Sequence, residues 1–344
     1  MKYFRVCLHD FGYELPPIEL SSRDLEERLA PVYERLKLPA GRLELMTGIS
    51  SRRFWPSGTR PSEGAVLAGK KALANSGIAA AQMGCLLFTS VSRDMMEPAT
   101  AAFVHRALGL PDSCLIFDIS NACLGFLNGM ITLANMIELG QVRSGLVVAA
   151  ETAEHLLEST IAHMLADLSL TRKTIKPLFA SLTIGSGAVA LVMSDKRFVD
   201  SGHMLAGGAC RAHTEHNDLC QGGQNAEQGT LMSTDSELLL EKGIETAAHC
   251  WQDFQEELGW PAAAVDRFFC HQVGRVHARQ LFERLRLDGQ KNFETLPFLG
   301  NVGSVSAPIT MAIGIERGKL ATGSRAAVLG IGSGINSLML GIDW

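Results

Sequence analysis

Cys123 is the residue best placed for nucleophilic chemistry, within the sequence FDISNACLGFLNGM. An apolar strand pattern, CLIFDI, runs into it, and an apolar helix pattern follows. This order predicts a thiol at a helix N-terminus, where the helix dipole and unpaired backbone amides favour a thiolate and can hold an oxyanion. Position alone leaves a second interpretation open, in which Cys123 is a small buried core thiol, as Cys85 and Cys114 are expected to be.

Two polar residues further along the chain also have positions that suit catalysis. His271 follows the strand pattern Arg267–Cys270, and ligands bind at the carboxyl ends of strands in open α/β sheets. Asn301 lies in GNVGSVSAP, a glycine-flanked loop before an apolar helix. A satisfied strand-end histidine and a turn or N-cap asparagine remain alternatives. The turn GIGSGIN (Gly330–Asn336), which holds Ser333, either brings backbone amides close to a ligand or joins two strands tightly.

The composition excludes several classes of partner. The 344 residues are 47% apolar, enough for one large domain or two of ordinary size. A net charge of −5, from 31 basic and 36 acidic side chains, predicts no nucleic-acid partner. The N-terminus turns polar too early for a signal peptide, and the lack of about 18 consecutive apolar residues argues against membrane insertion. Eight cysteines scattered without CxxC pairing predict reduced thiols in a cytoplasmic protein.

Short apolar runs alternate with amphipathic helix patterns along the chain. The predicted strands, continuous as in a sheet covered on both faces, are Gly84–Ser90, Cys114–Ile119, Gly145–Ala150, Ala188–Met193, Arg267–Cys270 and Arg325–Leu329. The predicted helices are Glu63–Ala74, Thr100–Leu108, Leu124–Leu139 and Asp235–Leu258. Alternation of this kind predicts a largely parallel sheet layered with helices.

The segment that begins at Cys123 repeats weakly at Asn301, at an offset of 178 residues. Identical residues at this offset include Gly125 and Gly303, Thr132 and Thr310, and Glu138 and Glu316. Chance matching of two Gly/Ala-rich helices is one explanation. The other is two similar halves, residues 1–195 and 196–344, packed so that two helix heads meet, one bearing Cys and the other Asn. The polar, glycine-rich segment Asp195–Gly229 marks the expected seam.

Together the motifs NAC-x-G-F, HQV, GNVG-S-x-x-x-P and GIGSG resemble the thiolase superfamily, most closely its ketoacyl-ACP synthase III branch. TGISSRR (Thr47–Arg53) and SGAVALVM are similar to the same branch, and the resemblance covers essentially the whole chain. It implies the α/β thiolase fold, with two pseudo-symmetric halves in a five-layered αβαβα arrangement, and a homodimer.

The resemblance also implies roles for the candidate site residues. Cys123 is then the nucleophile that becomes acylated, while His271 and Asn301 polarise the thioester carbonyl of the second substrate and stabilise the enolate. The backbone amides of Cys123 and Ser333 form the oxyanion hole for the acyl-cysteine. CoA thioesters are implied as substrates, with no separate cofactor and no metal.

The segment SVSRDMMEPATAAF (Ser90–Phe103) is similar to that of OleA-type thiolases, which join two long-chain acyl-CoAs head to head. Housekeeping members of the branch usually carry an apolar residue at the position of Glu97, where the partner subunit closes the acyl tunnel. A non-decarboxylating Claisen condensation must remove an α-carbon proton, and a carboxylate in a dry, apolar site is a stronger base. Glu97, acting across the homodimer interface, is the expected base, and a helix-start carboxylate ahead of Pro98 is the alternative.

Long acyl chains require apolar channels. The candidate lining residues, each better explained by core packing when taken singly, are Met95, Met96, Leu124, Phe126, Leu127 and the segment Thr160–Leu170. The tryptophan and arginine that hold CoA in housekeeping synthases have no clear match before Thr47, so Arg53, Trp55 and Arg275 are the candidates. The sequence therefore leaves open whether long-chain acyl-CoA or acyl-ACP is the donor.

Four other functions fit parts of the sequence. A decarboxylative ketoacyl-ACP synthase III, which primes fatty-acid or polyketide synthesis from acyl-CoA and malonyl-ACP, uses the same Cys–His–Asn set. A relative that esterifies an alcohol or amine forms no carbon–carbon bond. A metal site at Cys210, His213, His216 and Cys220 has ligand-capable types but not the usual structural-zinc spacing. A non-catalytic subunit is disfavoured by the intact Cys–His–Asn set.

Overall fold

The computed structural model describes residues 1–225 and 229–344, and ten strands within these ranges form one mixed sheet. The first five are β1 (Val6–Glu14), β4 (Cys85–Phe88), β5 (Leu115–Asp118), β6 (Ser144–Glu151) and β7 (Gly187–Asp195). The second five are β8 (Met204–Ala212), β11 (Arg267–Cys270), β12 (Asn292–Phe293), β13 (Arg325–Gly332) and β14 (Asn336–Asp343). Their order across the sheet is β12-β11-β13-β14-β8-β1-β7-β6-β4-β5, so the order β1-β7-β6-β4-β5 recurs as β8-β14-β13-β11-β12.

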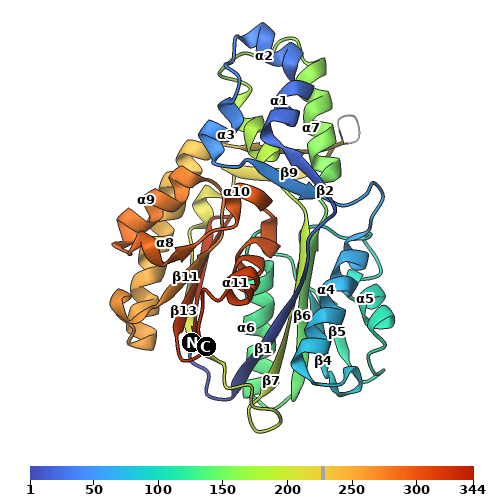
Figure 1. Cartoon of the computed structure of the whole chain (residues 1–344), viewed down its shortest axis with the longest axis vertical. Helices are drawn as coiled ribbons and strands as arrows, with labels where there is room; N and C mark the ends of the chain where they lie inside the picture. Colours follow the sequence, from blue (N-terminus) through green and yellow to red (C-terminus); the bar gives the residue numbers. More distant parts are fainter. Residues whose placement is uncertain (226–228) are drawn as a thin grey trace.

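Helices lie on the outer faces of both halves of the sheet, and two further helices fill the space between the halves (Figure 1). The outer face of the first half carries α4 (Pro61–Ser76) and α5 (Thr100–Leu108), and that of the second half carries α8 (Ser236–Leu258) and α9 (Arg275–Leu285). Between the halves lie α6 (Gly125–Glu138) and α11 (Ser306–Glu316), whose apolar side chains join strands of both halves in one core. The five-layered αβαβα arrangement is confirmed.

The two central helices occupy equivalent places, since α6 connects β5 to β6 and α11 connects β12 to β13. The match at an offset of 178 residues therefore lies in equivalent elements of the two halves. The division into residues 1–195 and 196–344 falls between β7 and β8, and it stays a prediction. The expected seam, Asp195–Gly229, contains β8 and begins a hairpin of β9 (Cys220–Asn225) and β10 (Gly229–Thr234), while residues 226–228 lie outside the described residues.

The prediction of a largely parallel sheet is wrong. Only β4 with β5 and β6, and β11 with β12 and β13, pair in parallel among the described strands of the sheet. The pairs β6 with β7 and β13 with β14 are antiparallel, as are those along the seam. A tight turn can join only antiparallel strands, and the turn between Gly332 and Asn336 is one of these.

The individual elements agree better with the sequence patterns. All six predicted strands overlap observed ones, and α4, α5, α6 and α8 lie where helices were predicted. The patterns missed β1, β8 and β14, which lie along the seam. They also missed the antiparallel pair of β2 (Ile18–Ser21) and β3 (Ser51–Phe54) and the short helices between these strands, α1 (Ser22–Arg28), α2 (Ala30–Leu36) and α3 (Arg42–Thr47).

These N-terminal helices and α7 (Glu154–Ala166) form a cap at one end of the molecule, shown at the top of Figure 1. Ile161, Met164 and Leu170, from the segment expected to line an acyl channel, are buried in the core of this cap. Phe126 and Leu127 lie in the central core, so the structure gives these candidates packing roles. No helix in the described ranges is long and apolar enough to cross a membrane.

Candidate active site

Cys123 lies in a tight turn between β5 and α6, two residues before the helix begins. Ala122, immediately before it, has φ 44°, a left-handed backbone conformation that residues other than glycine rarely adopt. The amide of Leu124 donates to the carbonyl of Asn121 at 2.9 Å, which closes the turn. Backbone outliers of this kind cluster at functional sites, because the surrounding structure must hold them in place.

The turn that holds Ser333 lies against the Cys123 turn. A Cβ on Gly330 would lie 2.5 Å from Cδ2 of Leu124, so glycine at this position permits the close approach. Nδ2 of Asn121 donates to Oδ1 of Asn336 at 3.2 Å, and Nδ2 of Asn336 donates to the carbonyl of Ser333 at 3.0 Å. The two turns predicted to form the oxyanion hole are therefore neighbours joined by a chain of amide hydrogen bonds.

Asn301 is 8% exposed, and its amide has a defined orientation. Its Oδ1 accepts hydrogen bonds from the amide of Gly303 at 3.0 Å and from Oγ of Ser306 at 3.4 Å. Its backbone is fixed by bonds to Thr183 and Gly185, at 2.9 and 2.8 Å. With Oδ1 occupied, the Nδ2 group is the part of this side chain that can donate to a substrate.

The heads of the two central helices meet as the internal repeat predicts. Gly125, at the start of α6, lies so close to the neighbouring loops that a Cβ there would be 2.4 Å from the carbonyl oxygen of Thr89 and 3.5 Å from Cβ of Ser304. Ser304 lies in η6 (Gly303–Val305), the short helix that precedes α11. The Cys123 turn and the Asn301 loop thus approach each other from opposite halves.

His271 follows β11 directly and is 4% exposed. Burial, with a smaller contribution from His277, lowers its pKa to about 3, so the imidazole is neutral at physiological pH. Its Nδ1 has no hydrogen-bond partner among the described residues. Gln272 beside it accepts from the amide of Thr295 at 3.0 Å, which fastens the strand end to the segment that leads to Asn301.

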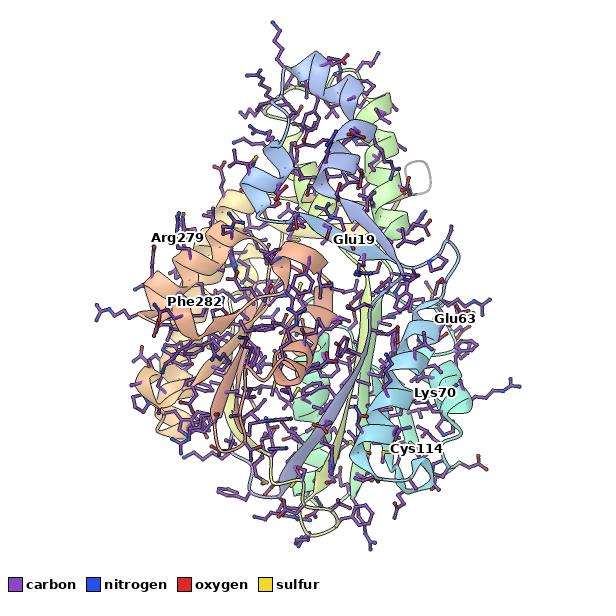
Figure 2. The ribbon with its side chains drawn as sticks, in the orientation of Figure 1. Glu19, Glu63, Lys70, Cys114, Arg279 and Phe282 are labelled. Atoms are coloured by element: carbon purple, nitrogen blue, oxygen red, sulfur yellow. The ribbon has the colours of Figure 1, made fainter. Side chains whose placement is uncertain are left out.

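The thiol of Cys123 is not ionised at rest. Burial, with smaller contributions from Cys220 and Glu151 nearby, raises its pKa to about 12, so the prediction of a resting thiolate is wrong. The helix begins only after the thiol, and loss of water around the sulfur outweighs the field of the helix end. Cys85 and Cys114 are buried core thiols as predicted, and Cys114, labelled in Figure 2, packs in the cluster under α4 and α5.

Glu151 is a component of the site that the sequence interpretation missed. It ends β6 and is 6% exposed, and it lies close enough to Cys123 to affect its titration. Its carboxylate accepts hydrogen bonds from Val91, Ser92 and Ser304. The signal was present in the sequence as a carboxylate that directly follows the apolar strand pattern Gly145–Ala150.

Glu97 lies apart from the other site residues in the single chain. It is exposed on the loop of residues 89–99 between β4 and α5. One side of this loop is held by Asp94, which accepts from the amide of Ser62 at 2.9 Å, and the other by Glu151. No hydrogen bond within the described chain joins Glu97 to Cys123.

The candidates for CoA recognition have different environments. Trp55 is buried and donates from Nε1 to the carbonyl of Glu151 at 3.2 Å, so stacking on a nucleotide is excluded for it. Arg53 pairs with Glu19, labelled in Figure 2, at 3.1 Å. Arg275 is exposed at the start of α9, beside Gly48, and remains the candidate that is free to meet a phosphate.

The proposed zinc ligands have other contacts. Nδ1 of His213 hydrogen-bonds Oγ1 of Thr246 at 3.0 Å, and Sγ of Cys220 accepts from Oγ1 of Thr234 at 3.5 Å. Cys210 is exposed on β8. Across residues 1–225 and 229–344, no three His, Cys, Asp or Glu side chains are grouped as metal ligands.

Comparison with known families defines the class of protein. A family model for 3-oxoacyl-[acyl-carrier-protein (ACP)] synthase III matches residues 117–206, and the model for its C-terminal part matches residues 255–344. These spans contain Cys123 in the first case and His271 and Asn301 in the second. The chain therefore belongs to the synthase III family, a group of thiolase-fold acyltransferases.

Within this family the chain groups with the acyl-CoA:acyl-CoA alkyltransferases, or OleA proteins. The enzyme so named from Shewanella oneidensis is 42% identical and that from Xanthomonas campestris pv. campestris 38% identical, each match covering 100% of both chains. A beta-ketoacyl-[acyl-carrier-protein] synthase III from Koribacter versatilis is 27% identical and covers 99% of this chain and 98% of its own.

Solved structures of Xanthomonas campestris OleA have the same fold. The cerulenin-bound form has a TM-score of 0.95 at 37% identity, covering 100% of this chain and 98% of that one. Other solved forms of that protein replace a single cysteine, glutamate or histidine. Those three residue types are the ones predicted here to act as nucleophile, base and carbonyl-polarising group.

Proposed function

We propose that the protein catalyses a non-decarboxylative Claisen condensation of two long-chain acyl-CoAs and releases a 2-alkyl-3-keto acid. The observation that carries the proposal is the end-to-end match, at 42% identity, with an acyl-CoA:acyl-CoA alkyltransferase. The local geometry supports it, because the Cys123 turn adjoins both the Ser333 turn and the loop that carries Asn301.

In the first half-reaction, Sγ of Cys123 attacks the carbonyl carbon of one acyl-CoA. The backbone amides of Cys123 and Ser333 hold the oxyanion that forms. The carbon–sulfur bond to CoA then breaks, and CoA leaves as a thiol with the proton that Cys123 gives up. Because burial keeps the pKa of the thiol high, this proton leaves only as the sulfur attacks.

In the second half-reaction, Glu97 of the partner subunit removes a proton from the α-carbon of the acyl-cysteine. The carbanion attacks the carbonyl of the second acyl-CoA, which releases CoA, and water then cleaves the acyl-cysteine to give the keto acid. Neutral His271 and Nδ2 of Asn301 each have an N–H to donate to the second carbonyl, and both are held in place by neighbouring hydrogen bonds.

A homodimer would complete this site. Met96, beside Glu97, is 94% exposed, and Val91 and Met95 on the same loop are also exposed. The nearby edge strand β5 exposes Leu115. A second copy that covers these apolar side chains would also exclude water from Glu97. The acyl-CoA substrates and the reduced cysteines support a cytoplasmic location.

The test is to incubate the purified protein with myristoyl-CoA alone and analyse products by mass spectrometry. We expect release of CoA and a ketone of nearly doubled chain length, formed when the keto acid loses carbon dioxide. Cys123→Ser should lower product formation by roughly four to six orders of magnitude and abolish the covalent adduct. Release of carbon dioxide from malonyl-ACP, with no coupling of myristoyl-CoA, would instead establish the decarboxylative synthase and exclude our proposal.

A further inference from the structure

The carboxylate of Glu151 is buried and fully used as a hydrogen-bond acceptor. Its Oε1 accepts from the amide of Val91 at 3.0 Å and from Oγ of Ser304 at 2.9 Å. Its Oε2 accepts from the amide of Ser92 at 3.0 Å and from Oγ of Ser92 at 2.8 Å. Both oxygens therefore receive two good hydrogen bonds inside the protein.

These donors come from two loops that are far apart in the sequence. Val91 and Ser92 belong to the loop of residues 89–99, which carries Glu97. Ser304 belongs to the loop that carries Asn301, and Gly303, the residue before Ser304, donates its amide to Oδ1 of Asn301. A Cβ on Gly303 would lie 3.2 Å from Oε1 of Glu151, so this loop lies directly against the carboxylate.

The geometry requires a carboxylate at this position. Backbone N–H groups can only donate, and they approach both oxygens, through Val91 on one side and Ser92 on the other. An amide in place of the carboxylate would turn its NH₂ group toward one of these donors. No Lys or Arg pairs with Glu151 in the described parts of the chain. Burial therefore raises the pKa of its carboxyl, although the hydrogen bonds from Val91, Ser92 and Ser304 act to lower it.

We propose that Glu151 is a positioning residue for the condensation step, since its carboxylate joins the Glu97 loop to the Asn301 loop. This inference rests on the proposed function. Glu97 and Asn301 both serve the second half-reaction, whereas acylation depends on the Cys123 and Ser333 turns, which have their own amide contacts. Because Glu97 serves the partner's site, one Glu151 fixes groups that belong to both active sites of the dimer.

The experiment separates the two half-reactions in Glu151→Gln. Acylation is followed as the mass of the Cys123 adduct after rapid mixing with myristoyl-CoA, and coupling as formation of the long ketone. We expect coupling to fall about 10- to 100-fold while acylation changes by less than about threefold. Glu151→Asp, which keeps the charge on a shorter side chain, should recover part of the coupling rate.

Ser144→Ala is the matched control for a lost buried hydrogen bond. Ser144 begins the strand that Glu151 ends, is fully buried, and donates from Oγ to the carbonyl of Gln82 at 2.8 Å. We expect this variant to leave both rates at the wild-type level even if its melting temperature falls. Equal losses of acylation and coupling in Glu151→Gln would show a merely structural role and overturn the proposal.

Single-hydroxyl variants test the proposal if Glu151→Gln does not fold. Ser92→Ala and Ser304→Ala should each lower coupling about 3- to 10-fold, and together they should lose less than the product of the two effects, because both act through one carboxylate. Wild-type coupling by these variants would also overturn the proposal. Failure of the wild-type protein to couple myristoyl-CoA would instead count against the proposed function.

Discussion

Equivalent loops in the two halves of the protein differ in length and in where they place a catalytic candidate. After β4, eleven residues (89–99) precede α5, and Glu97 lies exposed near the end of this loop. After β11, four residues (271–274) precede α9, and His271 is buried at its start. Since β4 and β11 hold the same place in the repeated strand order, the difference lies in the loops alone.

The comparison teaches that loop length decides which site a side chain can serve. The short loop keeps His271 inside its own subunit, fixed through its backbone amide to Leu329 at 2.8 Å. The long loop carries Glu97 out to the surface together with exposed methionines. A repeated fold can therefore supply one group to its own site and another to the site of a neighbour.

Replacing Glu97 tests the long loop and should give the largest effect. Glu97→Ala should lower coupling of myristoyl-CoA by about 10²- to 10⁴-fold, because the proposed base for the α-proton is lost, while the Cys123 adduct should still form. Product formation and adduct mass measure the two steps separately. Glu63→Ala, which removes an exposed glutamate on α4, is the control and should change neither.

A mixture of two inactive variants tests whether Glu97 acts across the interface. Co-expressed Cys123→Ser and Glu97→Ala chains should form mixed dimers in which one site has both an intact cysteine and the partner's glutamate. We expect these mixed dimers to recover roughly half of the wild-type coupling rate per dimer, given one competent site of two. If purified mixed dimers recovered no coupling, Glu97 would not act in the site of the partner subunit, and the contrast drawn between the two loops would be wrong.

Two equivalent glycines test how tightly the heads of the two central helices pack against the neighbouring segments. A Cβ on Gly125 would meet the backbone oxygen of Thr89, so Gly125→Ala should lower the free energy of unfolding by about 2–3 kcal/mol. Gly303 has φ 55° and lies against a side chain, so Gly303→Ala should cost about 1–2 kcal/mol. Urea denaturation measures both, with Gly289→Ala, which meets no neighbouring atom, as the control. An equal loss of unfolding free energy in the two variants would show that the backbone contact at Gly125 is no tighter than the side-chain contact at Gly303.

Acid pH tests the buried state of His271 and should give the smallest effect. Its pKa is about 3 in the folded protein and about 6.5 when unfolded, so below pH 6.5 the unfolded state takes up a proton that the folded state does not. Stability therefore falls as the pH drops, and His271→Gln should reduce the loss between pH 8 and pH 5 by about 2 kcal/mol. Urea denaturation at both pH values measures this loss.

The exposed His155 provides the control for that measurement. His155→Gln should leave the difference between pH 8 and pH 5 unchanged, because this side chain is exposed to solvent in the folded protein. If His271→Gln showed the same acid sensitivity as the wild-type protein, His271 would have to be more accessible to solvent than the structure shows.

The sequence predicted the parts of the molecule that local patterns specify. Continuous apolar runs marked buried strands such as Arg267–Cys270, and cysteine, histidine and asparagine followed strands or preceded helices as the structure has them. The repeat at Cys123 and Asn301 correctly indicated two helix heads in contact, because equivalent segments of similar halves occupy equivalent places.

The rest depended on contacts between segments far apart in the chain. The antiparallel seam of β1 and β8 joins the halves, and no local pattern encodes that pairing. The protonated thiol follows from the burial of Cys123, which a helix-end argument ignores. Glu151 gains its partners from residues 59 to 153 positions away, so its sequence context alone shows only a carboxylate after a strand.

The burial of α11 limits how the protein can be divided. Every residue from Ser306 to Gly314 is buried, because both half-sheets and α6 pack around this helix. A helix that is apolar all round has no face to present to water. The duplicated halves would therefore not behave as interchangeable modules: a chimera that exchanges one of them must be matched to the other across the whole central layer, or it will aggregate.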